Sequence, residues 1–200
     1  MTTSPLERLG LRERKKLKTR RAIQEHALRL FLANGYDATT VEQIAEAAEV
    51  SPSTFFRYFP SKEDVVVTDE YDPLIVESLR AQPGDLSPVE ALRATLREII
   101  GMMRAEDRQR IVERVTLSMS VPALRARQWE NMQDTQLLIA QTLAERVGRS
   151  PDDFELRAFS GALLGVWQAT ILTWVENVGE SDLLDLLERG LDYLSAGCPL

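Results

Sequence analysis

Apolar residues recur at intervals of three and four along most of the chain, which is the period of an amphipathic helix. The first such stretch covers residues 17–33 and ends at Asn34 and Gly35, a pair typical of a helix end. Because no stretch alternates with a period of two between turn signals, we expect no β-strands. The pattern predicts an all-α protein with about nine helices.

Start signals mark the next helices. Thr40 and Gln43 have the spacing of a capping box, which predicts a second, short helix. Ser51 followed by Pro52 predicts the start of a third helix, which Pro60 ends. Further helices are expected at about 61–80, 88–103, 107–117, 122–147, 150–177 and 181–194.

Two short helices joined by a tight turn at Glu49, with a basic helix before them, form the layout of a helix-turn-helix. On a helical wheel of the third helix, Phe55 and Phe59 share one face, whereas Ser53 and Arg57 point away from it. An arginine so placed can read guanine in the major groove with two donors. The alternative is an arginine on a solvated face without a partner, and spacing alone leaves both open.

The charges are distributed unevenly. The net charge is -7, but residues 1–30 hold nine basic and three acidic side chains, whereas residues 69–200 hold 13 basic and 22 acidic ones. The N-terminal end is therefore suited to a polyanion. Residues 12–16 form a basic arm before the first helix, which we expect to lie along the DNA backbone or in the minor groove. A solvated tail is the alternative.

Composition and residue types exclude several classes of protein. The chain of 200 residues is 44% hydrophobic and 28% charged, which is typical of a soluble globular protein. One cysteine, Cys198, and one histidine, His26, can form neither an internal disulfide nor a zinc site, so we expect a cytoplasmic protein without a metal. The longest nearly uncharged stretch, residues 161–175, is shorter than the roughly 20 residues that span a bilayer, so no membrane partner is expected.

We expect no enzyme and no cofactor. His26 and Cys198 have no evident catalytic partners, and the chain has no nucleophile elbow, P-loop, zinc-protease or dinucleotide-binding motif. The remaining alternative to DNA binding is a helical adaptor that binds other proteins. Such an adaptor would show no salt-dependent affinity for DNA.

The N-terminal region resembles a known family. The residues that carry the resemblance are 19–31, Gly35, Thr40, Ile44, Ala45, Val50, Ser51, Thr54, Phe55, Phe59, Ser61, Lys62 and Glu63. Over about residues 17–65 the chain is similar to the N-terminal domain of the TetR family of bacterial transcriptional regulators. The resemblance implies a dimeric repressor that binds a pseudo-palindromic DNA operator, and a larger C-terminal domain whose small-molecule effector changes the affinity for DNA. The chain then divides into a basic arm at 1–16, a helix-turn-helix domain at 17–65 and a ligand-binding and dimerisation domain at 66–200.

The resemblance also implies which residues touch DNA. Thr40 and Lys62, at helix starts, suit phosphate contacts, whereas Arg57 suits a base. The family often has Tyr where this chain has Phe56, so we expect the hydroxyl of Tyr58 to replace that contact. The full set is Thr40, Ser51, Ser53, Thr54, Phe56, Arg57, Tyr58 and Lys62.

Two further positions depart from the family pattern, which commonly has Gly at both. Either Glu49 adopts the conformation of that glycine at a cost of about 1 kcal/mol, or the turn differs slightly. Ser53 adds a hydroxyl to the recognition helix.

The C-terminal region offers a dimer interface. Residues 159–175 are apolar on nearly every side of a helix, with Gly161, Gly165 and Ala169 at spacings of four. The last helix carries a broad stripe of leucines. Together the two helices resemble the four-helix interface of the family's dimer, and the alternative is a purely intramolecular core.

Methionine and tryptophan are concentrated in the middle helices, where flexible apolar side chains suit an adaptable pocket. We therefore expect an apolar or amphipathic effector. Its pocket is expected to be lined in part by Met102, Trp129, Met132 and Leu163. The alternative for each of them is an ordinary core position.

Overall fold

The structure, a computed structural model, describes residues 5–68, 71–177 and 181–199. All regular elements of these residues are helices, nine of them with seven residues or more, which confirms the predicted class. The helices are α1 (Pro5–Arg8), α2 (Leu11–Asn34), α3 (Val41–Ala47), α4 (Pro52–Tyr58), α5 (Asp64–Val67), α6 (Asp72–Ala81), α7 (Pro88–Met102), α8 (Ala105–Ser120), α9 (Pro122–Val147), α10 (Phe154–Glu176) and α11 (Leu183–Ser195).

The chain folds into two compact units. The first unit contains the described residues up to 68 together with Glu113–Asn131, and the second contains the remainder of the described chain. The first unit thus includes the end of α8 and the start of α9, which a division at residue 65 assigns to the C-terminal domain. The reason is that Leu117, Val121 and Leu124 pack into the hydrophobic core of the helix-turn-helix.

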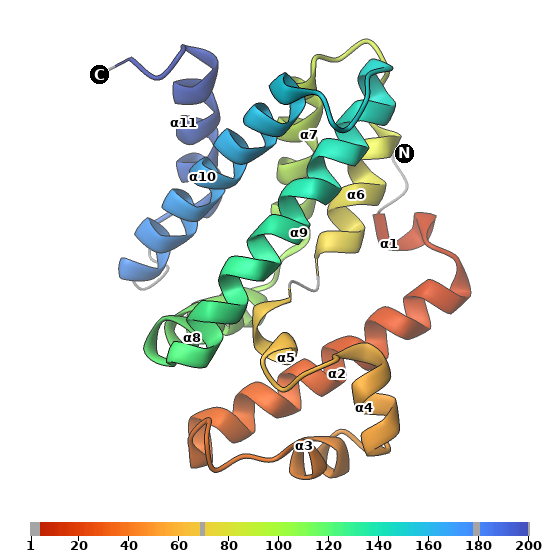
Figure 1. Ribbon diagram of the computed structural model, residues 1–200, viewed down its shortest axis with the longest axis vertical. Helices are drawn as coiled ribbons and strands as arrows, with labels where there is room; N and C mark the ends of the chain where they lie inside the picture. Colours follow the sequence, from red (N-terminus) through yellow and green to blue (C-terminus); the bar gives the residue numbers. More distant parts are fainter. Residues whose placement is uncertain (1–4, 69–70, 178–180, 200) are drawn as a thin grey trace. The chain divides into compact units, whose positions relative to one another are not determined.

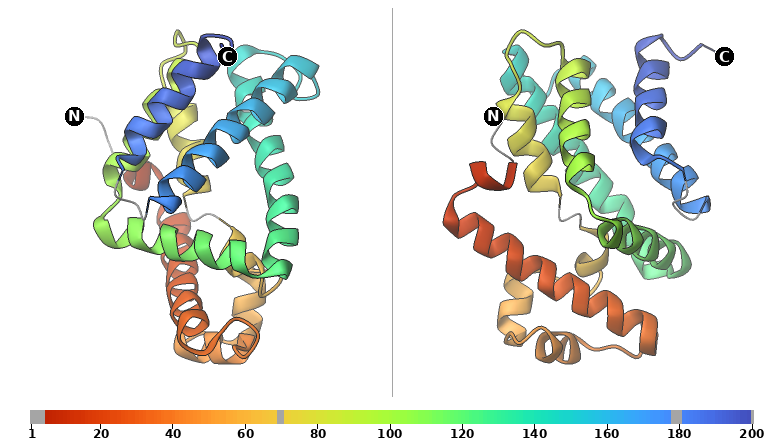
Figure 2. Two further views of the ribbon diagram at one scale, coloured as in Figure 1. Left: turned by 90° about the vertical axis from the view of Figure 1, so that its left-hand side faces the viewer. Right: turned by 180° about the vertical axis from the view of Figure 1, so that it is seen from behind.

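Within the first unit, α3 and α4 lie on the same side of the long helix α2 (Figures 1 and 2). Both predicted caps are present. Thr40 and Gln43 bond reciprocally at the start of α3, and the Ser51 hydroxyl oxygen accepts a hydrogen bond from the Thr54 N–H at the start of α4. These caps set where the two helices of the motif begin.

Several predicted boundaries are wrong; the helix expected at 150–177, for example, begins only at Phe154. The first helix begins at Leu11 rather than at residue 17, so the basic residues 12–16 form its opening turns and not an extended arm. Arg, Lys, Leu and Glu all favour helix, which explains the longer element. The helix expected at 61–80 is divided, because α5 ends at Val67 and α6 begins at Asp72. The β-branched run 65–68 favours helix poorly, and Pro73 suits a first turn.

In the second unit, α11 packs closely against α10. Leu183, Leu187 and Leu191 of α11 are buried within the chain. Gly190 is required by this packing, since a Cβ there would lie only 2.5 Å from Cγ1 of Val166 on α10. Most of the leucine stripe of the last helix is therefore used inside the protomer.

Part of α10 is left open by the chain, including Ala158, Ala162, Gly165 and Ala169. By length and composition α10 is the single helix of the described residues that could cross a membrane. Only 28% of its most apolar 18-residue stretch is buried. A core helix of a soluble protein passes the same test, so this is weak evidence for a membrane segment. The exposure of this part of α10 therefore needs another explanation.

Candidate nucleic-acid interface

Two phenylalanines hold α4 in the first unit. Phe55 and Phe59 are buried in one core with Ile23 of α2 and Ile44 of α3. Ser53 and Arg57, on the opposite side of α4, are exposed. The helical wheel is therefore confirmed, and α4 presents a polar face outward as a recognition helix does.

Three hydroxyl groups gather at the start of this polar face. The Ser51 Oγ donates to Thr54 Oγ1 over 3.0 Å and lies 2.9 Å from the Ser53 Oγ. Because each hydroxyl can both donate and accept, the group can bond to a phosphate or to a base edge. The cluster brings together three of the predicted DNA-contacting residues.

The rest of the exposed face of α4 carries one cation and aromatic rings. The Arg57 guanidinium carbon lies 5.5 Å from the centre of the Tyr58 ring, so the two side chains are neighbours. The Phe56 ring is 49% exposed and meets Phe55 edge to face. A phenylalanine cannot donate to a phosphate, but its ring suits contact with a thymine methyl group.

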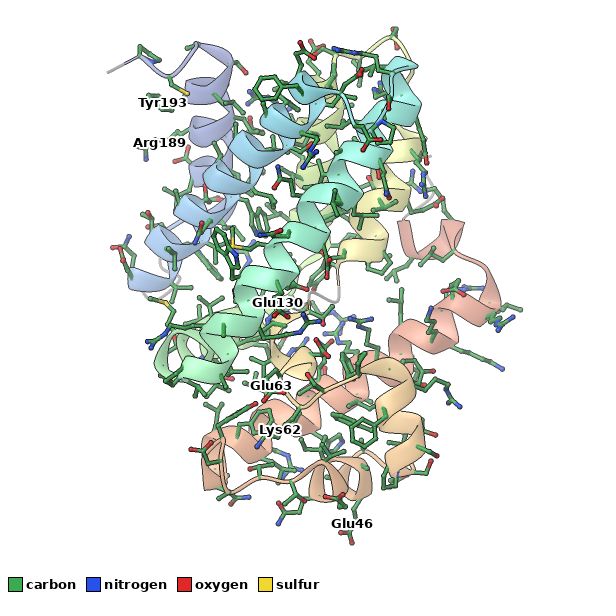
Figure 3. All side chains as sticks on the ribbon, in the orientation of Figure 1. Glu46, Lys62, Glu63, Glu130, Arg189 and Tyr193 are labelled. Carbon is green, nitrogen blue, oxygen red and sulfur yellow. The ribbon has the colours of Figure 1, made fainter. Side chains whose placement is uncertain are left out.

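Lys62 points into the protein rather than freely into solvent. Its Nζ donates to the carbonyl oxygens of Tyr36 at 3.0 Å and Thr39 at 3.2 Å, and it lies 4.1 Å from the centre of the Tyr36 ring. Figure 3 shows Lys62 and Glu63 on the segment that follows α4. Lys62 therefore holds the loop before α3, a structural role that its place at a helix start did not reveal.

Tyr36 and Glu63 form a second link to the same loop. The Tyr36 hydroxyl donates to Glu63 Oε1 over 2.7 Å. Burial, and then the bond to this carboxylate, raise the pKa of Tyr36 far above its ordinary value. Burial alone would raise the pKa of Glu63, but hydrogen bonds from Tyr36, from the backbone and from Ser61, together with the nearby Lys62 charge, outweigh it, so that pKa is lowered. At neutral pH the pair is a neutral phenol bonded to a carboxylate.

The positive-φ turn between α3 and α4 contains no glycine. Glu49 has a φ of +54°, the left-handed conformation in which the family commonly uses glycine. Of the two alternatives, the turn thus keeps its conformation and Glu49 bears the strain. The remaining predicted phosphate-binding residue, Thr40, is exposed and caps α3 beside this motif.

The four residues expected to line an effector pocket do not share one environment. Leu163 is buried, and Met102 and Met132 are half-buried in the second unit. Trp129 belongs to the first unit and is 65% exposed. The pocket remains a prediction, and Trp129 is the member that fits it least.

Comparison with known proteins gives one match to the N-terminal part of the chain and one to the C-terminal part. The family model for bacterial regulatory proteins of the tetR family matches residues 23–67, and the model for the MftR C-terminal domain matches residues 86–199. The transcriptional regulator TcmR of Streptomyces glaucescens is 34% identical over 173 residues, which are 82% of this chain and 76% of that protein. This chain belongs to the TetR family. It is a DNA-binding transcriptional regulator with an N-terminal helix-turn-helix.

Two solved structures of other regulators have the same fold. FadR of Thermus thermophilus, a transcriptional repressor solved in complex with lauroyl-CoA, is 29% identical with a TM-score of 0.56, and the match covers 90% of this chain and 95% of FadR. FadR of Bacillus halodurans is 22% identical with a TM-score of 0.59, over 90% of this chain and 95% of that one. At that identity the second match supports the fold alone.

Proposed function

We propose that this TetR-family regulator is a cytoplasmic repressor that binds a pseudo-palindromic operator as a homodimer and leaves it when a small apolar or amphipathic molecule binds. The outward face of α4 is the observation that supports the DNA-binding part of this proposal. There Arg57 and three hydroxyl groups stand on a short helix that two buried phenylalanines hold in place. Two such helices in a symmetric dimer read two half-sites about one helical turn apart, or a multiple of it.

The open face of α10 supports the homodimer. Phe154 is 79% exposed, and the same face continues through small exposed residues. These are Ala158, Ala162, Gly165 and Ala169. Small side chains let a second helix approach closely, and a second copy of the chain supplies the matching face in a two-fold dimer. Arg189 and Tyr193 project from the neighbouring helix α11 (Figure 3), where they suit the rim of such an interface.

The effector proposal rests on the apolar side chains of the second unit and on the Thermus thermophilus relative that holds lauroyl-CoA. Met102, Met132 and Leu163 are flexible or buried apolar groups that suit an acyl chain. To move the protein from almost fully bound to almost fully released, the effector must prefer the released conformation by about 5.5 kcal/mol. Tight binding to both conformations would not release DNA.

Selection of duplexes from a random library tests the DNA-binding proposal directly. We expect the wild-type protein to enrich a pseudo-palindrome, and to bind it less tightly as salt is raised because bound cations are released from the phosphates. Light scattering should give twice the chain mass of 22.6 kDa. A monomer that enriches no pseudo-palindrome would contradict the proposed homodimeric repressor.

Lauroyl-CoA, lauric acid and free CoA, added separately to the complex with the selected duplex, test the effector class. Release by lauroyl-CoA or lauric acid but not by CoA supports an apolar or amphipathic effector. If none of the three shifts the duplex affinity, the acyl proposal is wrong for this protein, whereas the DNA-binding proposal stands on the selection.

A further inference from the structure

The four-residue helix α5 follows α4 by only five residues and is entirely buried. Val65, Val66 and Val67 pack in the core of the first unit, together with Leu124 of α9. A single helical turn has little stability of its own, so its place is set by the groups around it. These groups come from three other helices of the same unit.

Side chains from α2, α8 and α9 bind the carbonyl groups at the end of α5. Gln24 Nε2 donates to the Thr68 oxygen at 2.8 Å and to the Val65 oxygen at 3.2 Å. Arg114 donates to the Thr68 oxygen at 3.0 Å, and Asn131 donates to the Val67 oxygen at 3.3 Å. The carbonyl groups that a helix end leaves without partners are thus bound from three directions.

At its other end α5 is held by one buried carboxylate. Asp64 is 4% exposed, and its Oδ2 accepts hydrogen bonds from the backbone N–H and the hydroxyl of Ser61, both at 2.9 Å. Its Oδ1 accepts a bond from Nε of Arg127 on α9 at 2.7 Å. One side chain therefore joins the turn after α4 to the start of α9.

Neither member of this pair is placed to touch DNA. Asp64 is buried and bears the wrong charge, and the Arg127 guanidinium is engaged by Asp64 and by Glu130. The pair acts on the turn of residues 59–63, whose first residue, Phe59, is one of the two anchors of α4. A side chain that reads a base must be held to within about half an ångström, which requires supporting contacts of this kind.

We propose that Asp64 and Arg127 are positioning residues for operator recognition: they set the orientation of α4 by fixing the turn that follows it. This inference rests on the proposed DNA-binding function. The buried phenylalanines keep α4 on α2 and α3 when the pair is removed, so the expected loss is in the discrimination between sequences. Contacts of the basic first turns of α2 with phosphates do not depend on the pair, so affinity for unrelated DNA should be kept.

The experiment uses the full-length protein and the duplex that the wild type selects, with a scrambled duplex of equal length. Asp64→Asn, Arg127→Gln and the double variant are compared at one salt concentration, at a temperature where circular dichroism shows each of them folded. Glu130→Gln is the matched control, because it removes the exposed partner of the same guanidinium and leaves Asp64 bound.

We expect each single variant to lose about tenfold or more in operator affinity, while its affinity for the scrambled duplex is nearly unchanged. The double variant should lose no more than the weaker-binding single variant, because each substitution breaks the same Asp64–Arg127 interaction. Arg127→Lys should recover part of the affinity because it keeps the charge but not the geometry of the guanidinium. Equal losses on both duplexes, or additive losses in the double variant, would overturn the proposal.

Amide hydrogen exchange without DNA gives a second measurement. Exchange over residues 55–62 should be faster in Asp64→Asn and Arg127→Gln than in the wild type, and unchanged in Glu130→Gln. Unchanged exchange in all variants would overturn the positioning role even if no operator is found. A wild type that selects no duplex would instead count against the proposed function.

Discussion

At the scale of single residues, the helix-turn-helix combines one strained position with several polar links. Glu49 occupies a left-handed conformation that L-residues adopt at a cost, and Lys62 and Glu63 tie the segment after α4 to the loop before α3. Arg57 stands apart from both features, on the exposed side of α4. Strain, support and the proposed base contact thus belong to different residues, so they can be tested separately.

Replacing Glu49 by Gly should stabilise the protein by about 0.5–1 kcal/mol, because glycine adopts positive φ without a steric cost and this gain exceeds its entropic penalty. The measurement is the urea midpoint. Glu46→Gly, in the last turn of α3, is the matched control and should lower stability by up to about 1 kcal/mol. A lower midpoint for Glu49→Gly would show that the Glu49 side chain makes a compensating interaction.

Replacing Tyr36 by Phe should lower stability by about 1–2 kcal/mol at neutral pH, because the bond to the Glu63 carboxylate is lost. Glu63 has a lowered pKa in the folded state. Its contribution to the free energy of unfolding is therefore present above its ordinary pKa and disappears as the pH falls through its pKa in the folded protein. Tyr36 has a raised pKa, so its contribution is complete below about pH 10 and is lost as the pH rises further.

Denaturation of both proteins across pH checks this expectation. The difference between wild type and Tyr36→Phe should be level from about pH 6 to 9, shrink in acid and shrink again in strong base. A difference that does not change with pH would mean that the hydroxyl contributes through packing alone.

Arg57→Ala should cost roughly 1–3 kcal/mol of binding free energy on the selected operator and relax the preference at one position in each half-site. The side chain is exposed, so the unfolding midpoint should stay the same. Arg149→Ala, which removes an exposed arginine of the second unit, is the control. Equal losses on operator and scrambled duplex would assign Arg57 to the phosphate backbone.

At the scale of elements, the crossing of α10 and α11 depends on one missing side chain. Gly190 lies in the interior of α11, where glycine costs about 1 kcal/mol relative to alanine in helix propensity. The close approach to Val166 explains why the chain has it there. Helix propensity and packing therefore make opposite predictions for an alanine at this position.

We expect Gly190→Ala to destabilise the protein, because overpacking a core costs about 1–3 kcal/mol and outweighs the gain in propensity. Gly101→Ala is the comparison, since a Cβ at this position of α7 meets no atom within 4 Å. That variant should be neutral or slightly stabilising in the same thermal unfolding measurement. A raised melting temperature for Gly190→Ala would mean that α10 and α11 can separate slightly at no cost.

At the scale of the whole molecule, the chain combines a basic beginning with an acidic remainder and an apolar helix face that the chain itself leaves open. The excess of basic side chains lies in residues 1–30, so electrostatic attraction to DNA is concentrated at one end of the sequence. The open face of α10 lies in the second unit. The chain thus separates the region that suits DNA from the region that suits a second copy.

Ala162→Glu places a charge in the middle of this α10 face. If the face is the dimer interface, the variant should scatter light as a 22.6 kDa monomer and bind the operator much more weakly, because burying an unpaired carboxylate is costly. Its helix content should be that of the wild type, since Ala162 is exposed within the protomer. A variant that stays dimeric with full operator affinity would move the interface elsewhere.

Much of the fold could be predicted from the sequence because its signals are local. The capping box at Thr40, the start at Ser51 and Pro52, and the outward direction of Arg57 all depend on residues within four positions of one another. The continuation of α2 into the basic residues and the break after Val67 were predicted wrongly. In both places intrinsic propensity competes with the period of apolar residues, and neither signal decides alone.

The sequence by itself determined that this protein is helical, that it carries a helix-turn-helix, and which face of α4 is polar. Only the tertiary structure decided that Lys62 bonds to the loop before α3, that Asp64 pairs with Arg127, and that Gly190 admits Val166. The physical reason is distance along the chain. Helix periods and caps involve neighbouring residues, whereas each of these contacts joins residues more than twenty positions apart, and no local pattern specifies which of many possible partners will meet.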